Sequence, residues 1–121
     1  MPKNNKPKKK FLIIEDEGDI CLMLNIMLEN EETTLEHVKS IKEAKEFLKE
    51  EKPDAIVLDN KLTDGFGIDF LEEIKKLHPN TTVVMISGQG EELKDKAIQN
   101  GANAYLAKPF SRKALEDALK N

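Results

Sequence analysis

Short apolar runs alternate along the chain with stretches that are apolar on one helical face only. Four runs are continuous: 11–14 (FLII), 55–58 (AIVL), 83–86 (VVMI) and 104–107 (AYLA). Continuous runs of this length, bounded by polar residues, are typical of parallel strands that are covered on both faces. A fifth stretch, 33–38 (TTLEHV), alternates apolar and polar residues, which predicts a less buried edge strand.

The stretches between these runs predict helices. Apolar residues recur at helical spacing within residues 20–28 and 68–77, and residues 40–43 (SIKE) form a capping-box sequence at the start of another helix. A more polar stretch, 91–100, is followed by a glycine, which is a natural helix stop. Ser111 is placed to cap the last helix.

This alternation of strand and helix, repeated five times, predicts an α/β fold. The expected architecture is a five-stranded parallel sheet with right-handed crossovers and helices on both faces. A doubly wound, flavodoxin-like sheet has the strand order 2-1-3-4-5, and ligands bind at its carboxyl edge between strands one and three. We therefore expect the functional site at that edge.

The composition narrows the class of protein. The length of 121 residues suits one domain, and no apolar run approaches the ~20 residues that a membrane span needs. The single cysteine, Cys21, excludes an intramolecular disulfide or a cysteine metal cluster. It favours a reducing, cytoplasmic location.

The net charge of −4 is the sum of two unlike segments. Residues 1–10 hold five lysines and no acidic residue, and we interpret them as a basic, flexible tail. Residues 11–121, interpreted as the folded domain, hold the other 14 of the 19 basic side chains and all 23 acidic ones, a net charge of −9. Such an acidic body repels phosphate, so direct nucleic-acid binding is not expected.

Polar side chains follow each continuous run. Glu15 and Asp16 follow the first run, Asp59 the second, Ser87 the third and Lys108 the fourth. Because the carboxyl ends of parallel strands share one edge, these side chains are expected to converge. Carboxylates this close repel one another, and a bound divalent cation relieves the repulsion. Oxygen ligands with no histidine or thiolate nearby in the sequence favour Mg²⁺ or Mn²⁺.

This set of side chains is equipped to accept a phosphoryl group. Asp59 would supply the attacking carboxylate oxygen. The metal and Lys108 would neutralise the equatorial phosphoryl oxygens, and Ser87 would donate a hydrogen bond to them.

The same residues, in this order, resemble the receiver domain of two-component response regulators, of which the chemotaxis receivers are examples. The resemblance covers residues 11–121, nearly the whole chain. The pieces that carry it are Glu15-Asp16-Glu17, Asp59-Asn60-Lys61, Gly67, Ser87-Gly88 and Tyr105-Leu106-Ala107-Lys108-Pro109-Phe110.

The resemblance implies a role for each residue that faces the phosphoryl group. Asp59 is expected to be the phosphoacceptor, which attacks a phosphohistidine on a partner kinase. Lys108 and Ser87 are expected to hold the transferred group. Tyr105 is expected to be an aromatic switch that turns inward when Ser87 moves.

The resemblance also implies a set of metal ligands. Asp16 and Asp59 would bind Mg²⁺, and Lys61 would contribute its backbone carbonyl. Glu15 stands where receivers more often have aspartate, and it would bind the metal directly or through water. Its longer side chain is expected to move the metal slightly.

The loop after Asp59 departs from the usual receiver pattern. Receivers usually have proline where Thr63 stands and often aspartate where Phe66 stands, so this loop is expected to be less rigid than in those receivers. Lys61 and Gln89 lie two residues after Asp59 and Ser87. We expect them to flank the phosphoryl group and to regulate how water reaches it.

Three functions are compatible with this sequence, and a signalling switch is the leading one. As a signalling switch, the domain is not expected to be an enzyme. It would take a phosphoryl group from a sensor histidine kinase or a phosphotransfer protein. The phosphorylated domain would then present an altered surface to a downstream protein or a linked effector domain. An aspartate-nucleophile hydrolase would have a second acid where Lys61 stands. A docking module that works without phosphorylation stays open. So does the choice between a stand-alone receiver and part of a longer regulator or hybrid kinase.

Overall fold

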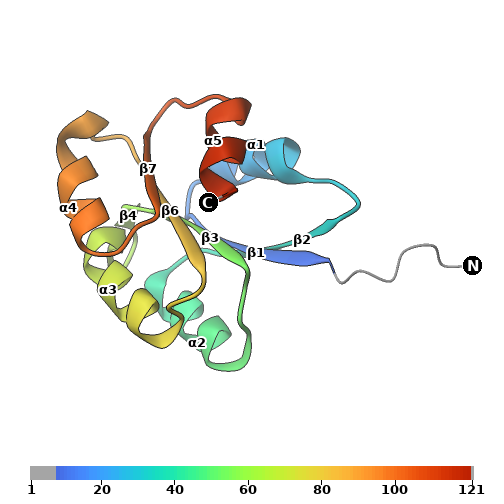
Figure 1. Cartoon of the computed structure of the whole chain (residues 1–121), viewed down its shortest axis with the longest axis horizontal. Helices are drawn as coiled ribbons and strands as arrows, with labels where there is room; N and C mark the ends of the chain where they lie inside the picture. The colour runs from blue at the N-terminus through green and yellow to red at the C-terminus, as the bar shows by residue number, and fades with distance from the viewer. Residues whose placement is uncertain (1–7, 121) are drawn as a thin grey trace, which may run out of the picture.

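The computed structural model describes residues 8–120, and its centre is a five-stranded parallel sheet (Figure 1). The strands lie in the spatial order β2-β1-β3-β6-β7, which is 2-1-3-4-5 when these five are counted along the chain. The predicted fold class is therefore confirmed. The strands are β1 Lys9–Ile14, β2 Thr33–Val38, β3 Ala55–Asp59, β6 Thr82–Ser87 and β7 Ala104–Ala107.

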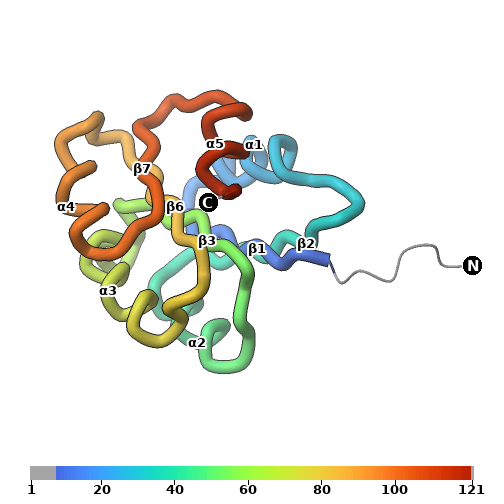
Figure 2. Tube along the Cα trace, viewed as in Figure 1, coloured from blue at the N-terminus to red at the C-terminus, as the bar shows by residue number. Residues whose placement is uncertain are grey.

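Helices cover both faces of this sheet. Figures 1 and 2 show α1 and α5 together on one side, with α2 and α3 on the other. Ser40 and Ser111 cap α2 and α5 as predicted, because their hydroxyl oxygens accept hydrogen bonds from the backbone N–H groups of Glu43 and Ala114. The helices are α1 Gly18–Leu28, α2 Ile41–Glu50, α3 Gly67–Leu77, α4 Lys94–Gln99 and α5 Arg112–Leu119.

The strands supply two cores, one under each helical layer. Successive side chains of a strand point to opposite faces, so Leu12 and Ile14 pack on the side of α2 and α3, while Ile13 packs on the side of α1 and α5. All three are fully buried, and burying each side chain contributes about 1.5–3 kcal/mol. The edge strand β2 has no buried residue, in agreement with its alternating sequence.

The first strand begins earlier than its apolar run. Lys9 and Lys10, which the sequence placed in a flexible tail, pair with β2 in the sheet. The backbone N–H of Lys10 also donates to the Asp54 carboxylate at 2.8 Å. Hydrogen bonds between strands join backbone groups and do not require apolar side chains at the rim of a sheet. Because the prediction relied on apolar residues, it placed the start of this strand too late in the chain. Residues 1–7 of the predicted tail lie outside the described residues.

The fourth helical segment also differs from its prediction. The stretch expected as one helix over 91–100 is a 3₁₀ turn, η1 Gly90–Leu93, followed by the short helix α4. Gly101 follows with φ +112°, a left-handed conformation that suits glycine at a helix end.

The loop after β3 forms a small hairpin of two strands, β4 Lys61–Leu62 and β5 Gly65–Phe66. Asp64 at its tip accepts hydrogen bonds from the backbone N–H groups of Ile41 and Lys42, at 2.8 and 3.0 Å, in the first turn of α2. These bonds hold the pKa of the Asp64 carboxyl below its ordinary value. These bonds hold the hairpin to the N-terminus of α2. They constrain a loop that has Thr63 where receivers usually have proline.

No helix formed by the described residues has both the length and the apolar character that are needed to cross a lipid bilayer.

At Gly67 a side chain would collide with the backbone of a neighbouring strand. A Cβ atom there would lie 2.3 Å from the backbone oxygen of Asp59 and 3.0 Å from Leu58 Cγ. Gly67→Ala must therefore displace backbone at the end of β3, and we expect a loss of about 1–3 kcal/mol in the free energy of unfolding, measured by urea denaturation.

Gly18→Ala is the matched control, since a Cβ atom there meets nothing within 4 Å. It should leave the free energy of unfolding unchanged or raise it by up to about 1 kcal/mol. Equal losses in the two variants would contradict the steric explanation.

Candidate functional site

Four strands end at one cavity on the carboxyl edge of the sheet. The strands end in step: Asp59 of β3 lies opposite Ile86, and Ser87 of β6 lies opposite Ala107 of β7. The cavity has a volume of about 440 Å³. Its lining includes six of the predicted site residues: Asp16, Asp59, Lys61, Ser87, Gln89 and Lys108.

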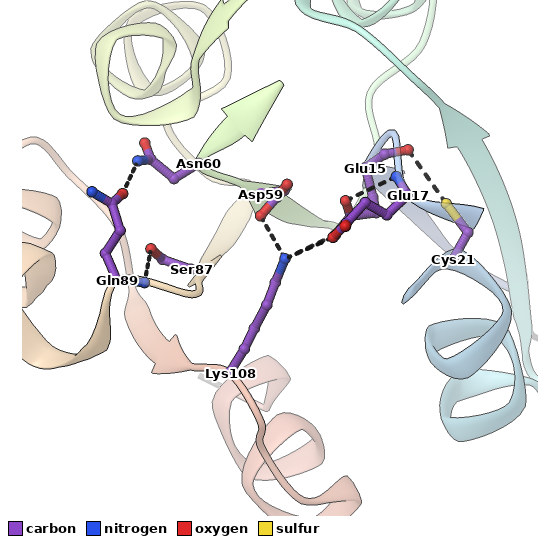
Figure 3. Close-up of polar contacts among 8 residues, drawn as sticks. All are labelled: Glu15, Glu17, Cys21, Asp59, Asn60, Ser87, Gln89 and Lys108. Atoms are coloured by element: carbon purple, nitrogen blue, oxygen red, sulfur yellow. Dashed lines mark hydrogen bonds and ion pairs between the residues drawn. The ribbon is translucent and has the colours of Figure 1, made fainter. Parts of the chain in front are cut away.

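Lys108 reaches across the cavity to the acidic side chains (Figure 3). Its ammonium group lies 3.0 Å from Asp59 Oδ1, 3.5 Å from Glu15 Oε1 and 3.8 Å from Glu17 Oε1. Burial lowers the pKa of Lys108, but the hydrogen bond and charge of Asp59, with the charge of Glu15, outweigh burial and raise the pKa above its ordinary value. Lys108 therefore stays charged at neutral pH.

Glu15 is the most strongly perturbed acid of the site. Its side chain is fully buried. Burial and the neighbouring charge of Asp59 raise the pKa of Glu15 to about 7, although the Glu17 N–H and Lys108 act in the opposite direction. At neutral pH this carboxyl group is therefore close to half protonated when no cation is bound.

The predicted acidic ligands are brought together. Carboxylate oxygens of Glu15, Asp16 and Asp59 all lie within 4.8 Å of one another. Glu15 and Asp59 are buried, whereas Asp16 is half-buried and faces the cavity. A group of carboxylate oxygens fits a hard divalent cation, so the residues present match the predicted metal.

Ser87 and Tyr105 both contact the turn that follows β6. The Ser87 hydroxyl oxygen accepts a hydrogen bond from the backbone N–H of Gln89 at 3.0 Å. Tyr105 is 6% exposed, and its hydroxyl donates to the backbone carbonyl of Gly90. In this structure the Tyr105 ring already lies inward.

Asn60 belongs to the receiver motif, but no feature of the sequence indicated the contacts that it makes. It is 2% exposed, its Oδ1 accepts from the backbone N–H of Ile68 at 3.0 Å, and its Nδ2 donates to Gln89 Oε1 at 2.6 Å. Figure 3 shows that this bond ties the residue after Asp59 to the turn after Ser87. Asparagine is common in turns, so its type alone carried no signal.

Cys21 borders the acidic group of the site. Its side chain is half-buried, and its thiol donates to the backbone carbonyl of Glu15 at 3.3 Å. Burial and the negative charge of Glu15 raise the pKa of this thiol, which disfavours the reactive thiolate.

A model of the response regulator receiver domain matches residues 11–120. The chain belongs to this family. Receiver domains are signalling domains of two-component systems and do not form a conventional class of enzyme.

Curated relatives of this receiver differ in length. It is 36% identical over 113 residues to the response regulator protein PilR of Pseudomonas aeruginosa, a match that covers 93% of this chain and 25% of PilR. It is 30% identical to the chemotaxis protein CheY of Halobacterium salinarum, over 93% of this chain and 95% of CheY. This receiver thus spans a quarter of one relative and nearly all of the other.

A solved structure resembles the receiver closely. A response regulator protein from Burkholderia pseudomallei, with a phosphorylated aspartic acid, a calcium ion and citrate, superposes with a TM-score of 0.84 at 26% identity. The match covers 93% of this chain and 66% of that one. That structure contains a calcium ion, and the acidic group of Glu15, Asp16 and Asp59 in this chain is consistent with binding of a divalent metal.

The raised pKa of Glu15 predicts how stability depends on pH. The pKa is about 7 in the folded chain and 4.5 in an unperturbed carboxyl group, so the stability associated with protonated Glu15 is present below pH 4.5 and is lost as the pH rises through 7. Without divalent metal at pH 8, Glu15→Gln should therefore be more stable than the wild type by about 3 kcal/mol. The difference should disappear near pH 4.

Urea denaturation in EDTA across this pH range tests the expectation. Glu116→Gln, at an exposed position on α5, is the matched control and should show no such trend. A wild type that is more stable than Glu15→Gln at pH 8 without metal would show that Glu15 is not strained by its surroundings.

Proposed function

We propose that this receiver is a phosphoacceptor of a two-component phosphorelay and that Asp59 carries the phosphoryl group. The observation that supports this most is the surroundings of Asp59. Its carboxylate is 3% exposed, lies at the end of β3 against a 440 Å³ cavity, and has an ammonium group 3.0 Å away. A carboxylate held in this way is positioned for attack and is shielded from most of the solvent.

The reaction exchanges one bond to phosphorus for another. A carboxylate oxygen of Asp59 attacks the phosphorus of a phosphohistidine on the donor protein, and an O–P bond forms as the N–P bond breaks. The electron pair of the broken bond stays on the histidine nitrogen. The product is an acyl phosphate on Asp59.

Glu15, Asp16 and Asp59 would hold the cation, and the backbone carbonyl of Lys61 would complete the protein ligands. We propose Mg²⁺, with Mn²⁺ as a substitute, because the donors are oxygens. When bound, the cation neutralises charge on the phosphoryl oxygens. It also offsets the repulsion among the carboxylates that raises the pKa of Glu15.

The remaining side chains would stabilise the transferred phosphoryl group and change position when it is bound. Lys108 would move from Asp59 Oδ1 to a phosphoryl oxygen with little displacement, and the Ser87 hydroxyl would donate to another. Movement of Ser87 would shift the turn that Tyr105 contacts through Gly90. A local charge change would thereby bias a two-state surface near α4 and β7.

The partners follow from this chemistry. The donor would be a sensor histidine kinase or a phosphotransfer protein in the cytoplasm. The recipient of the signal would be a downstream protein or a linked effector domain. The relatives include CheY, which this receiver matches over 95% of its length, and PilR, which it matches over 25%. Hydrolysis as the main activity is disfavoured by Lys61, which stands where such a hydrolase has its second acid.

Phosphorylation of Asp59 can be tested with a small-molecule donor. Incubation with acetyl phosphate and Mg²⁺ should give a hydroxylamine-labile adduct of one phosphoryl group, seen as a mass increase in intact-protein mass spectrometry. Asp59→Asn or EDTA should abolish the adduct, whereas Asp117→Asn, on the exposed surface of α5, should leave it unchanged. Absence of an adduct in the wild type would favour the docking module, and multiple turnover would favour the hydrolase.

The lifetime of the phosphoryl group tests the role proposed for Lys61 and Gln89. Both residues are exposed and line the cavity, so they would restrict the approach of water. The half-life of the Asp59 adduct, followed after removal of acetyl phosphate, should change in Lys61→Ala and in Gln89→Ala. Half-lives equal to that of the wild type would remove both residues from this role.

A further inference from the structure

Asn60 is bonded at all four of its polar groups. Its backbone N–H donates to the carbonyl of Ile86 at 3.1 Å, and its carbonyl accepts from the N–H of Gly67 at 2.6 Å. Its side chain accepts from Ile68 and donates to Gln89. These bonds fix Asn60 to β6 and to the start of α3, so its position does not adjust easily.

The backbone decides which way the Asn60 amide points. The N–H of Ile68 is a donor, so the atom of Asn60 that faces it must be the oxygen. The amide nitrogen of Asn60 then faces Gln89, and an oxygen of Gln89 must meet it at 2.6 Å. The donor and acceptor assignment of the Asn60–Gln89 bond is therefore determined by the chain itself.

We call residues 88–90 the switch turn. The Asn60–Gln89 bond opposes movement of this turn. The turn is coupled to Ser87, because the Ser87 hydroxyl accepts the Gln89 N–H at 3.0 Å. If Ser87 moves toward a group on Asp59, the backbone of Gln89 is drawn with it. The side chain of Gln89, however, is tied to Asn60, which cannot follow. Figure 3 shows the Gln89 amide on the side of Ser87 away from Lys108.

We infer that the Asn60–Gln89 hydrogen bond is a latch that holds the switch turn in its resting position and must break before Ser87 can engage a phosphoryl group. Asn60 acts through Gln89 and is a positioning residue. The latch rests on the function proposed for Asp59, Ser87 and Lys108. It adds an energetic threshold that is set by Asn60 and by Gln89, a cavity residue for which a role in water access is also proposed.

Gln89→Met tests the latch, because methionine has a similar length and no comparable acceptor. Gln89 is exposed, so the variant should fold. Its affinity for beryllofluoride with Mg²⁺, a stable mimic of the phosphoryl group, should rise about two- to tenfold over the wild type, the range expected for loss of one hydrogen bond. Gln99→Met, at an exposed position on α4, is the matched control and should bind like the wild type. Equal or weaker binding by Gln89→Met would overturn the latch.

A double-mutant cycle separates the latch from direct contact of Gln89 with the ligand. In an Asn60→Ser background the bond is already lost, so Gln89→Met should have no further effect on beryllofluoride affinity. A full effect in that background would mean that Gln89 acts on the ligand itself, which would overturn the latch.

Hydrogen exchange without any ligand keeps the test independent of phosphorylation. Backbone amides of residues 87–91 should exchange about two- to tenfold faster in Gln89→Met than in the wild type, with no change in Gln99→Met. Unchanged exchange would overturn the latch. If the wild type binds no beryllofluoride while Gln89→Met still exchanges faster, the proposed function is refuted, and only the part of the inference in which the Asn60–Gln89 bond holds the switch turn in its resting position remains.

Discussion

The carboxyl groups of Glu15, Asp16 and Asp59 lie close together at one edge of the sheet beside the ammonium group of Lys108, and this crowding governs the rest of the site. Two unit charges about 4 Å apart in partly shielded surroundings interact by roughly 4 kcal/mol. Lys108 balances part of the negative charge, at 3.0 Å from Asp59 and 3.5 Å from Glu15. Burial and the charge of Asp59 raise the pKa of Glu15 to about 7, and the group of carboxylate oxygens is consistent with binding of a divalent metal.

The carboxylates stay close together despite their repulsion because the packed core of the sheet fixes the positions of the strand ends. Ile13, Ile14 and Leu58 are fully buried just before the polar ends of their strands, and two helical layers cover them. Packing of this density does not relax to separate the charges. Gly67, with no side chain, lets α3 begin against the backbone of Asp59. The charges are therefore held together by the apolar core behind them.

The same close packing connects the site to its surroundings through a few hydrogen bonds. Asn60, the residue after Asp59, contacts both the start of α3 and the switch turn. Tyr105 contacts that turn at Gly90, and Asp64 holds the hairpin beside the cavity to α2. Through Asn60, the backbone next to Asp59 is therefore hydrogen-bonded to the start of α3 and to the switch turn.

The sequence by itself determined the order of elements, the sheet topology and the residues at the ends of the strands, because apolar periodicity and strand–helix alternation are local signals. Glu15, Asp16, Asp59, Ser87 and Lys108 could be named because each directly follows a buried run or belongs to the receiver pattern. Only the tertiary structure decided the rest: the pairing of Lys9 and Lys10, the attachment of Asp64 to α2, the pKa of Glu15 and the Asn60–Gln89 bond. Each of these joins residues far apart in the chain, and their distances depend on how the packed layers meet rather than on any local pattern.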